Sequence, residues 1–548
     1  MKKGGNLSGN RIELKKSQIE EAVALLHAGN FEDARVIYER ILQEDPNDCG
    51  ALNLLGLVDY SLKNYQQALI LFSKAISICP HQASFHSHLG NTFKELGRYS
   101  EALESYDQAI RINPKFAQAY MNRGVLLRKQ GRYAEALASF TNSIELDPND
   151  FKIFINCGNT LRDLGKFNEA LVMFDYAVNL QPDSPELFLD RANVLIDLML
   201  ISKALASYER SIYLRPDYSL AHMNKAHTLL ANGQFDEGFE SYEWRWRTTE
   251  FGSFIRSFPD PKSFSEPLWL GSQSLSGKTI LLQAEQGIGD IIQFCRYVNP
   301  LSDLGAHVIL EAPKKLVTLL NSLDGRYEVV SVDDALPHFD YRCPIMSLPR
   351  AFKTNLHNIP LSQGYLKADQ KRVSQIQEEI RLKNPHSKKL CGISWLSKAD
   401  KTGLFRSVHL KDFISMLAED DLLYVNLQYG EVDEEIAQVE KDLGVTVVNL
   451  DSVNKYDDID GLAAIIQACD LIISIDNTTV HLAGALGKDT RVLLPYVPAW
   501  RWMLGRKDSP WYQSLILYRQ PAVFDWVGVF ANLKEDLKVE ISTYYLNC

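Results

Sequence analysis

Prolines recur at a constant spacing of 34 residues through the first half of the chain, and this regularity limits the possible fold more than any other feature of the sequence. Small residues and aromatic-alanine pairs keep the same spacing. A repeating unit of this length is typical of paired helices, in which small residues allow close approach and the aromatic side chain fills the gap. We therefore predict an α-helical repeat array over residues 17–250, after a flexible stretch at residues 1–16. The prolines are Pro46, Pro80, Pro114, Pro148, Pro182 and Pro216; the small residues are Ala22, Gly56, Gly90, Gly124, Gly158, Ala192 and Ala226; the alanines are Ala34, Ala68, Ala102, Ala136, Ala170 and Ala204; the aromatics are Phe31, Tyr65, Tyr99, Tyr133 and Phe167.

The array resembles tetratricopeptide repeats in its period and in its order of small, aromatic and proline residues. The fifth repeat departs from the pattern, because Met199 and Ile201 stand where glycine and an aromatic residue are expected. We expect a tighter or tilted turn there. Stacked helix pairs form a solenoid with a long concave surface, and such surfaces usually hold an extended peptide or another protein. The resemblance therefore implies a protein partner.

Polar residues occupy one register position of the predicted first helices, two residues before the small residue. The array is similar to the repeat domain of O-linked N-acetylglucosamine transferases, in which asparagines at this place grip the backbone of the target protein. An asparagine side chain donates and accepts at once, as a peptide bond requires. Ordinary solvated polar positions are the alternative. The position is occupied by Leu54, His88, Asn122, Asn156, Asp190 and Asn224, of which Asn122, Asn156 and Asn224 are the predicted acceptor-binding residues.

The array ends in a segment where Trp244 and Trp246 alternate with Arg245 and Arg247. Such a segment could bind a ligand, but we favour a capping helix whose tryptophans seal the solenoid against the next domain. Residues 251–277 follow, rich in serine, phenylalanine and proline and without a steady period, and we interpret them as a linker.

Short apolar runs alternate with amphipathic helices from residue 278 onward, which is typical of parallel sheets covered on both faces. The first series spans residues 278–370 and the second spans residues 371–548. The predicted fold class is therefore an α-solenoid followed by two doubly wound α/β domains. Ligands bind at the carboxyl edges of such sheets, so we expect a cleft between the two domains.

The stretch "SIDNTTVHLAGALG", residues 474–487, places polar side chains at the end of a buried strand and the start of a helix. The free backbone N–H groups and the positive end of a helix favour an anion such as a diphosphate. A structural role in capping and packing is the alternative. The residues predicted to bind the donor here are Asp476, Asn477, Thr478, Thr479 and His481.

A counterpart in the first sheet is "QGIGD", where Gly287 and Gly289 permit a tight turn and Asp290 begins a helix. The third glycine of a dinucleotide fingerprint is missing, so the spacing alone is a weak signal. Asp290 either caps its helix or takes a proton from an attacking hydroxyl. We predict Asp290 as the catalytic residue, with both glycines beside the donor.

A basic loop after the first strand of the second domain supplies the predicted cations for a leaving diphosphate. Its candidates are Lys398, Lys401, Arg406 and Ser407. An ordinary exposed basic loop is the alternative. Trp500, Arg501 and Trp502 either line the cleft or form a structural cation-aromatic stack.

These motifs together resemble bacterial tetratricopeptide glycosyltransferases, whose second half is similar to the heptosyltransferase and O-linked N-acetylglucosamine transferase branches of the two-Rossmann-domain (GT-B) enzymes. The resemblance implies inverting sugar transfer from a nucleotide sugar to a protein hydroxyl, with no cofactor or metal ion, and with Asp290 as base. An Asp-Thr-x-x-x-His element of the heptosyltransferases falls on Asp476, Asn477 and His481, with asparagine replacing the usual threonine. Flagellin is the acceptor that such repeat-bearing transferases suggest, sometimes with CMP-linked donors. A non-catalytic scaffold with a degenerate transferase domain is the alternative.

Composition excludes several other classes of protein. A formal net charge of −11 and a pI near 5.6 give no general affinity for nucleic acid. No stretch reaches the ~20 apolar residues of a membrane helix. The eight cysteines are scattered, with no zinc-binding spacing, so we expect a reducing cytoplasm. Asp458 and Asp460 match a metal-binding D-x-D pattern, but we interpret them as a helix cap. The oligomeric state is not predicted.

Overall fold

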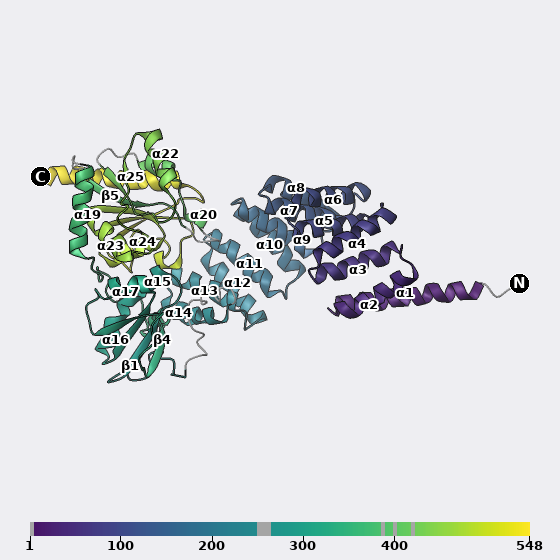
Figure 1. The fold of residues 1–548 in the computed structure, drawn as a ribbon, viewed down its shortest axis with the longest axis horizontal. Coiled ribbons are helices and arrows are strands. Elements are labelled where there is room, and N and C mark those ends of the chain that lie inside the picture. The colour runs from purple at the N-terminus through teal and green to yellow at the C-terminus, as the bar shows by residue number, and fades with distance from the viewer. Residues whose placement is uncertain (1–4, 249–264, 385–388, 398–402, 418–421, 548) are drawn as a thin grey trace. The chain divides into compact units, whose positions relative to one another are not determined.

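The computed structural model describes residues 5–248, 265–384, 389–397, 403–417 and 422–547 (Figure 1). The chain divides into two compact units, Met1–Leu200 and Ile201–Cys548. The division lies inside the repeat array, so the last repeat helices belong to the same unit as the two sheets.

The first unit consists of antiparallel helix pairs, as the 34-residue period predicts. Helix α1 covers most of residues 1–16, the stretch that we expected to be flexible. The helices are α1 (Gly5–His27), α2 (Phe31–Glu44), α3 (Cys49–Ser61), α4 (Tyr65–Ile78), α5 (Ala83–Glu95), α6 (Tyr99–Ile112), α7 (Ala117–Lys129), α8 (Tyr133–Leu146), α9 (Phe151–Asp163), α10 (Phe167–Leu180) and α11 (Pro185–Asp197).

The periodic glycines make room for an aromatic ring, but not for the ring that the sequence suggested. A Cβ atom added to Gly90 would lie 2.6 Å from the ring of Tyr106, and one added to Gly124 would lie 2.6 Å from the ring of Phe140. The predicted residues, such as Tyr99, instead begin the second helix of each pair and are half-buried. A side chain in the middle of the second helix faces the first helix directly, which a residue at its start does not.

The turn of the fifth repeat keeps the geometry of its neighbours, contrary to our expectation. Met199 adopts a left-handed backbone with φ of 57°, close to the 72° of Gly165. The Met199 N–H donates to Ile196 O over 2.8 Å, as Gly165 N–H donates to Arg162 O over 2.9 Å. Backbone hydrogen bonds therefore hold the turn in a conformation that costs a methionine more than a glycine.

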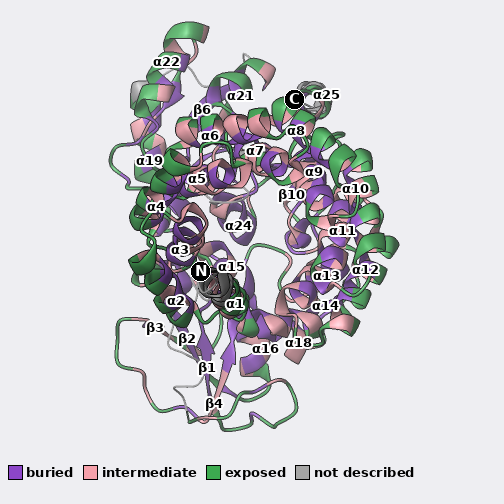
Figure 2. Cartoon of the chain, turned by 90° about the vertical axis from the view of Figure 1, so that its right-hand side faces the viewer, coloured by how far each residue is buried: buried purple, intermediate pink, exposed green. Residues whose placement is uncertain are grey.

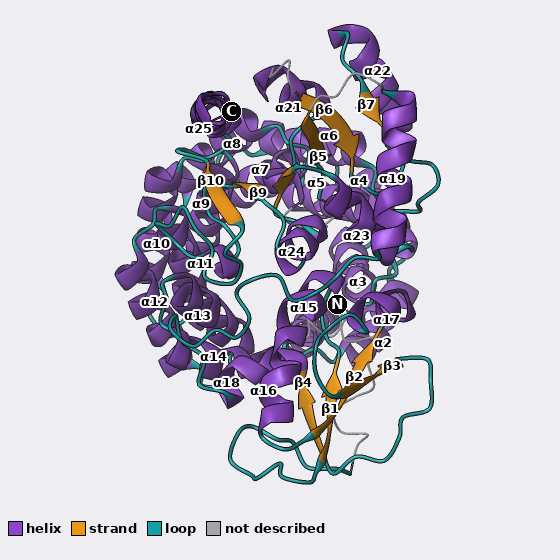
Figure 3. Ribbon diagram, turned by 90° about the vertical axis from the view of Figure 1, so that its left-hand side faces the viewer, coloured by secondary structure: helices purple, strands orange, loops and turns teal. Residues whose placement is uncertain are grey.

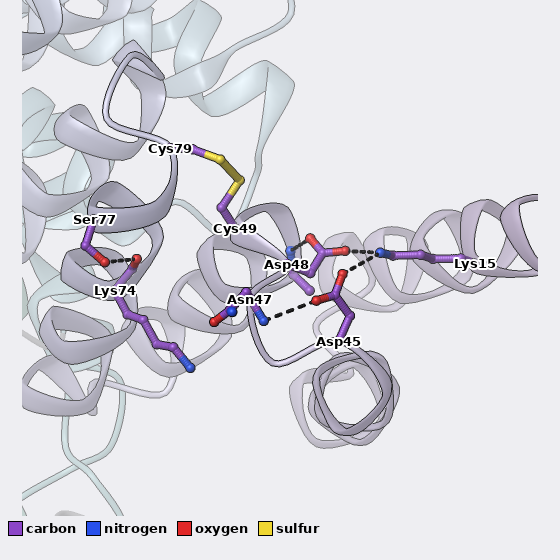
Figure 4. The surroundings of a disulfide bond; sticks show 9 residues. Lys15, Asp45, Asn47, Asp48, Cys49, Lys74, Ser77 and Cys79 are labelled. Carbon is purple, nitrogen blue, oxygen red and sulfur yellow. Dashed lines mark hydrogen bonds and ion pairs between the residues drawn. A yellow bond between two sulfur atoms is a disulfide. The ribbon is translucent and has the colours of Figure 1, made fainter.

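Cys49 and Cys79 form a disulfide bond, which the scattered cysteine positions did not suggest (Figure 4). Cys49 begins α3 and Cys79 follows the end of α4, and these ends meet because the two helices form an antiparallel hairpin. The Cα atoms are 6.2 Å apart, within the usual range for a disulfide. This pair runs against the reducing compartment that we expected, because disulfide bonds persist mainly in oxidising compartments.

The second unit contains a four-stranded and a six-stranded parallel sheet, whose strands are mostly buried (Figure 2). The four-stranded sheet has the order β3-β2-β1-β4. Its strands and the repeat and sheet helices around it are α12 (Ile201–Leu214), α13 (Ser219–Ala231), α14 (Phe235–Tyr242), η1 (Glu243–Arg247), β1 (Thr279–Gln283), α15 (Ile288–Phe294), η5 (Cys295–Tyr297), α16 (Val298–Asp303), β2 (His307–Ala312), α17 (Lys314–Leu320), β3 (Tyr327–Ser331), β4 (Tyr341–Pro344), η6 (Ile345–Ser347) and α18 (Leu348–Ala351).

The six-stranded sheet has the order β10-β9-β8-β5-β6-β7, which is the strand order of doubly wound dinucleotide-binding sheets. The apolar runs of the sequence predict every strand of this sheet except β10. Its elements are α19 (Gln370–Lys383), β5 (Lys389–Ser394), α20 (Gly403–Arg406), α21 (Leu410–Leu417), β6 (Leu422–Asn426), α22 (Asp433–Leu443), β7 (Val447–Val448), α23 (Ile459–Ala468), β8 (Leu471–Ile475), α24 (Thr478–Ala485), β9 (Thr490–Leu494), η7 (Trp500–Trp502), β10 (Leu515–Arg519) and α25 (Trp526–Asn547).

One hydrophobic core runs from the last repeat helices into both sheets. Phe239 of α14 and Leu230 of α13 belong to the same buried cluster as Ile280 of β1 and Ile472 of β8. The two sheets and the last repeat therefore fold as one body. Within the described ranges, no helix combines the length and the apolar character needed to cross a membrane.

Candidate functional site

The loops at the switch points of the two sheets come together. The strand order reverses between β1 and β4 in the first sheet and between β5 and β8 in the second. Helix α15 follows β1, helix α24 follows β8, and these two helices lie side by side in contact (Figure 3). A Cβ atom added to Gly289 would lie 2.8 Å from His481 Cδ2. Switch points are where ligands bind in open α/β sheets, so this is the candidate site.

Asp290 lies in the first turn of α15 and both of its carboxylate oxygens have partners. Oδ2 accepts a hydrogen bond from the Gly287 N–H over 2.9 Å, which caps the helix. Oδ1 forms an ion pair with Arg501 of η7. The Arg501 Nε also donates to Gln293 Oε1 over 2.8 Å. The structure therefore joins the predicted base to an arginine that the sequence analysis did not count among the donor-binding residues.

His481 is buried on α24 with its ring held from two sides. Its ring stacks on Trp502, with centroids 5.3 Å apart, and its Nδ1 lies 3.0 Å from the Tyr512 hydroxyl. Burial, reinforced by the charge of Arg501, lowers the pKa of His481 to about 4. The imidazole is therefore neutral at pH 7 and can donate or accept one hydrogen bond at Nε2.

This depressed pKa predicts an acid-sensitive contribution to stability. The unfolded chain binds a proton at His481 below about pH 6.5, whereas the folded protein binds it only below about pH 4. The free energy of unfolding should therefore fall as the pH is lowered from 6.5 to 4, by roughly 3 kcal/mol for this histidine. All eight tryptophans lie in the second unit, so chemical unfolding followed by tryptophan fluorescence measures this effect there.

The His481→Gln variant should show a shallower loss of stability over the same pH range than the unchanged protein. His307→Gln is the matched control, because the His307 side chain on β2 is 58% exposed. Equal slopes for the His481 variant and the unchanged protein would contradict the assignment of a buried neutral imidazole.

Asp476 lies between the end of β8 and the N-cap of α24 and is only 4% exposed. Arg406 Nη1 lies 3.1 Å from Asp476 Oδ2 as an ion pair, although no described donor is aligned with that oxygen for a hydrogen bond. Thr479, the second residue of α24, is 1% exposed, and its hydroxyl has no described partner. Buried polar atoms without a hydrogen bond are rare, so the Asp476 carboxylate and the Thr479 hydroxyl indicate a place where a polar ligand would supply the missing hydrogen bonds.

Asn477 is the N-cap of α24. Its Oδ1 accepts from the Thr479 N–H over 3.0 Å, and its Nδ2 donates to Ser394 Oγ over 2.7 Å, which ties the helix to the end of β5. The side chain is thus occupied by structural contacts. Thr478 is the first helical residue and is partly exposed, so its backbone lies at the open end of the helix.

The basic loop contributes one described cation to this site, Arg406. Ser407 instead holds the loop together, since its hydroxyl donates to Gly403 O over 2.7 Å and accepts from the Ser397 N–H over 2.9 Å. Lys398 and Lys401 lie outside the described residues.

The loop that carries Asp290 is fixed by the end of the repeat array. Arg245 of η1, 1% exposed, forms a two-pronged ion pair with Glu285, with both N–O distances at 2.9 Å. The Tyr242 hydroxyl accepts from Gln286 Nε2 over 2.8 Å. Although burial opposes it, the carboxylates of Glu285 and Glu243 raise the pKa of Arg245.

The prediction for the segment around Trp244 is therefore wrong in detail. Trp244 and Trp246 are only partly buried, whereas Arg245 is the residue inserted against the first sheet. Alternating tryptophan and arginine letters do not show which of the two side chains faces inward. The acidic Glu285 next to the glycine loop was the signal that could have identified the arginine as its partner.

The predicted acceptor-binding asparagines bond within the repeats. Asn122 Nδ2 donates to Ser87 Oγ over 3.2 Å, while its Oδ1 accepts from Gln118 over 2.9 Å. Asn156 Nδ2 donates to Lys152 O in its own helix over 2.8 Å. Asn224 also takes part in contacts. All three asparagines are half-buried. An acceptor protein that binds them would therefore have to replace the hydrogen bonds that they make within the repeats.

An open cavity of about 420 Å³ lies between α12, α13 and α14, away from Asp290 and His481, and is lined by residues including Tyr213, His222 and Trp244. Among the residues that the structure describes, no cluster of three or more His, Cys, Asp and Glu side chains is placed to hold a metal ion. Asp458 caps α23 by accepting from the Gly461 N–H, as predicted.

Comparison with known families identifies the repeats. Residues 19–83 and 117–150 match the tetratricopeptide repeat family, and residues 90–131 match a family described as TPR repeat. Protein FlbA of Caulobacter vibrioides is 29% identical over 309 residues, covering 52% of this chain and 49% of that protein. The chain thus spans about half the length of this relative.

Two solved structures are similar to part of this chain. One is pilF of Pseudomonas aeruginosa, at 20% identity and a TM-score of 0.35, covering 40% of this chain and 99% of that chain. Another is YrrB, described as a TPR protein with an unusual peptide-binding site, at 22% identity and a TM-score of 0.29, covering 34% and 97%. Scores this low carry no weight for function. The amino-terminal part of the chain consists of tetratricopeptide repeats.

Proposed function

We propose that the second unit is a glycosyltransferase of the GT-B kind, which moves a sugar from a nucleotide sugar to a Ser or Thr hydroxyl of a protein held by the repeats. The observation that carries this proposal is the contact between α15 and α24 at the switch points of two parallel sheets. Such a meeting place suits a ligand that spans two doubly wound domains.

The proposed reaction is a displacement at the anomeric carbon with inversion. The acceptor hydroxyl transfers its proton to the Asp290 carboxylate, its oxygen forms the new bond to the sugar, and the bond from the sugar to the phosphate oxygen breaks. The nucleotide leaves with the electron pair of that bond. The positive end of α24 would face this developing charge, and Arg406, which pairs with Asp476 at the same end of the helix, would add a cation beside it. No metal ion takes part in this scheme.

The acceptor would be a protein, since tetratricopeptide repeats generally mediate contacts between proteins. Flagellin is the acceptor we propose, with Asn122, Asn156 and Asn224 as contacts to its backbone. A CMP-linked donor would leave with one phosphate, and a UDP-, GDP- or ADP-linked donor with two.

A second function remains a candidate because of one specific observation. Asp290 is paired with Arg501 and its other oxygen caps α15, so the carboxylate has no free role in this state. A scaffold that recruits proteins through its repeats, and retains the sheets as a nucleotide-binding or docking domain, would need no free base.

A binding screen with UDP-, GDP-, ADP- and CMP-linked sugars separates the two functions. A donor at 100 times its dissociation constant should stabilise the protein by about 2.7 kcal/mol, measured by tryptophan fluorescence during thermal unfolding. The donor that stabilises is then incubated with flagellin, and the mass of flagellin and the released nucleotide are measured. Flagellin binding without stabilisation by any donor, and without a mass increase, would favour the scaffold.

A further inference from the structure

Arg501 lies in η7 of the second sheet domain, but its side chain is bound by residues of the first sheet domain. Its Nη2 pairs with Asp290 and its Nε donates to Gln293 of the same helix α15. The Arg501 side chain is 13% exposed and its guanidinium lies 4.7 Å from the centre of the Trp500 ring. Its Nη1 has no partner among the described residues and is not among the fully buried atoms. One donor of this buried cation is therefore available to a ligand.

The charges around Arg501 balance in this state. Asp290 and Asp476 supply two carboxylates, Arg501 and Arg406 supply the two guanidinium groups paired with them, and His481 is neutral. A further buried cation, Arg296, has its donors committed to main-chain carbonyls and to the Tyr365 hydroxyl. A phosphate entering at α24 adds negative charge to a site with no uncommitted cation among these groups. Binding through the free Nη1 draws Arg501 away from Asp290, because one guanidinium shared between two anions leaves each of them incompletely neutralised in a buried site.

Gln293 provides a second sign that the arrangement around Arg501 is incomplete. The Gln293 side chain is fully buried, its Oε1 accepts from Arg501, and its Nε2 donor has no described partner. A buried amide donor without an acceptor is rare in proteins. An anion bound at Arg501 would bring acceptor oxygens close to this donor.

We propose that Arg501 is the phosphate ligand of the site and that it holds Asp290 only until an anion arrives. Carboxylate and phosphate both use the same fork of guanidinium donors, so the two partners compete for it. Anion binding therefore frees Asp290 Oδ1, and a donor sugar must bind before the carboxylate can accept a proton. The role of the freed Asp290 as a base rests on the proposed function. The competition between carboxylate and phosphate for Arg501 does not.

Binding of inorganic pyrophosphate, measured by isothermal titration calorimetry, tests the competition without any sugar. Asp290→Asn removes the competing carboxylate charge and should tighten pyrophosphate binding at least fivefold. Arg501→Gln should weaken binding at least tenfold, and Arg501→Lys by less. Asp290→Asn combined with Arg501→Gln should bind as weakly as Arg501→Gln alone. Arg506→Gln is the matched control, since Arg506 lies in the same segment and its side chain pairs with the exposed Asp508 alone among the described residues. This variant should bind pyrophosphate as the unchanged protein does.

Pyrophosphate binding that is unchanged or weakened in Asp290→Asn would overturn the proposal, as would unchanged binding in Arg501→Gln. Absence of binding in both the unchanged protein and Asp290→Asn would also overturn it. If Arg501→Gln does not fold, the Arg501→Lys and Asp290→Asn results decide. Pyrophosphate competition without transfer of any sugar would remove the proposed function and leave this inference intact.

Discussion

Asp290→Asn should reduce the rate of sugar transfer roughly 10²- to 10⁴-fold, the usual effect of removing a general base. The asparagine keeps the size of the side chain and can still accept from the Gly287 N–H, so the cap of α15 is largely retained. It cannot take the proton of the acceptor hydroxyl. The measurement is the turnover number for transfer, at saturating donor, with the donor identified by the binding screen.

Asp303→Asn is the control for this variant, because Asp303 is an exposed carboxylate at the end of α16 in the same sheet domain. Its turnover number should equal that of the unchanged protein. The Asp290 variant should combine tighter pyrophosphate binding with lost transfer, whereas a folding defect lowers both. Transfer at the normal rate in Asp290→Asn would exclude Asp290 as the base.

Arg245→Met should lower the free energy of unfolding of the second unit by about 3 to 5 kcal/mol, the usual cost of breaking a buried ion pair from one side. It leaves the Glu285 carboxylate, 4% exposed, and the neighbouring Glu243 without their common cation. Urea unfolding followed by tryptophan fluorescence measures the change. Glu285→Gln should cost less, because the amide can still accept from the Met346 N–H, which lies 2.8 Å from Glu285 Oε1.

Arg350→Met is the matched control for Arg245→Met. Arg350 also forms a two-pronged pair with a glutamate of the repeats, Glu240, but that carboxylate is 64% exposed. Exposed pairs contribute about 0 to 1 kcal/mol, so the control should change stability far less. Equal losses for the two arginine variants would show that burial of the Arg245 pair has no special effect.

The periodic parts of the fold were predictable because they depend on local spacing. A 34-residue period identified the helix pairs, and short apolar runs identified every strand except β10. Which aromatic fills the gap beside Gly90 depends on where a side chain points, and the letters alone misassigned it to Tyr99 instead of Tyr106. The pairing of Cys49 with Cys79 likewise depends on how two helix ends meet.

The candidate site was predictable only in part. Asp290 and His481 were identified from polar residues that follow buried strands, and the structure brings their helices into contact. Arg501 was recognised as part of the W-R-W segment, but its pairing with Asp290 joins residues more than 200 positions apart. No periodic signal marks such a pair. The same holds for Arg245 and Glu285, whose interaction depends on tertiary packing.

The shared core of the last repeat and the sheets decides where such a chain can be divided. The buried cluster that contains Trp269 and Ile280 also contains Phe235, Phe239 and Tyr242 of the last repeat. A division of the chain after residue 250 would therefore remove apolar side chains that pack against the sheet domain. Exchange of the repeats between related chains is thus expected to leave the sheet domain folded when the junction lies ahead of Ile201, where the chain divides into its two units. The repeats before that residue form a unit of their own, whereas the last repeat shares one hydrophobic core with the sheets.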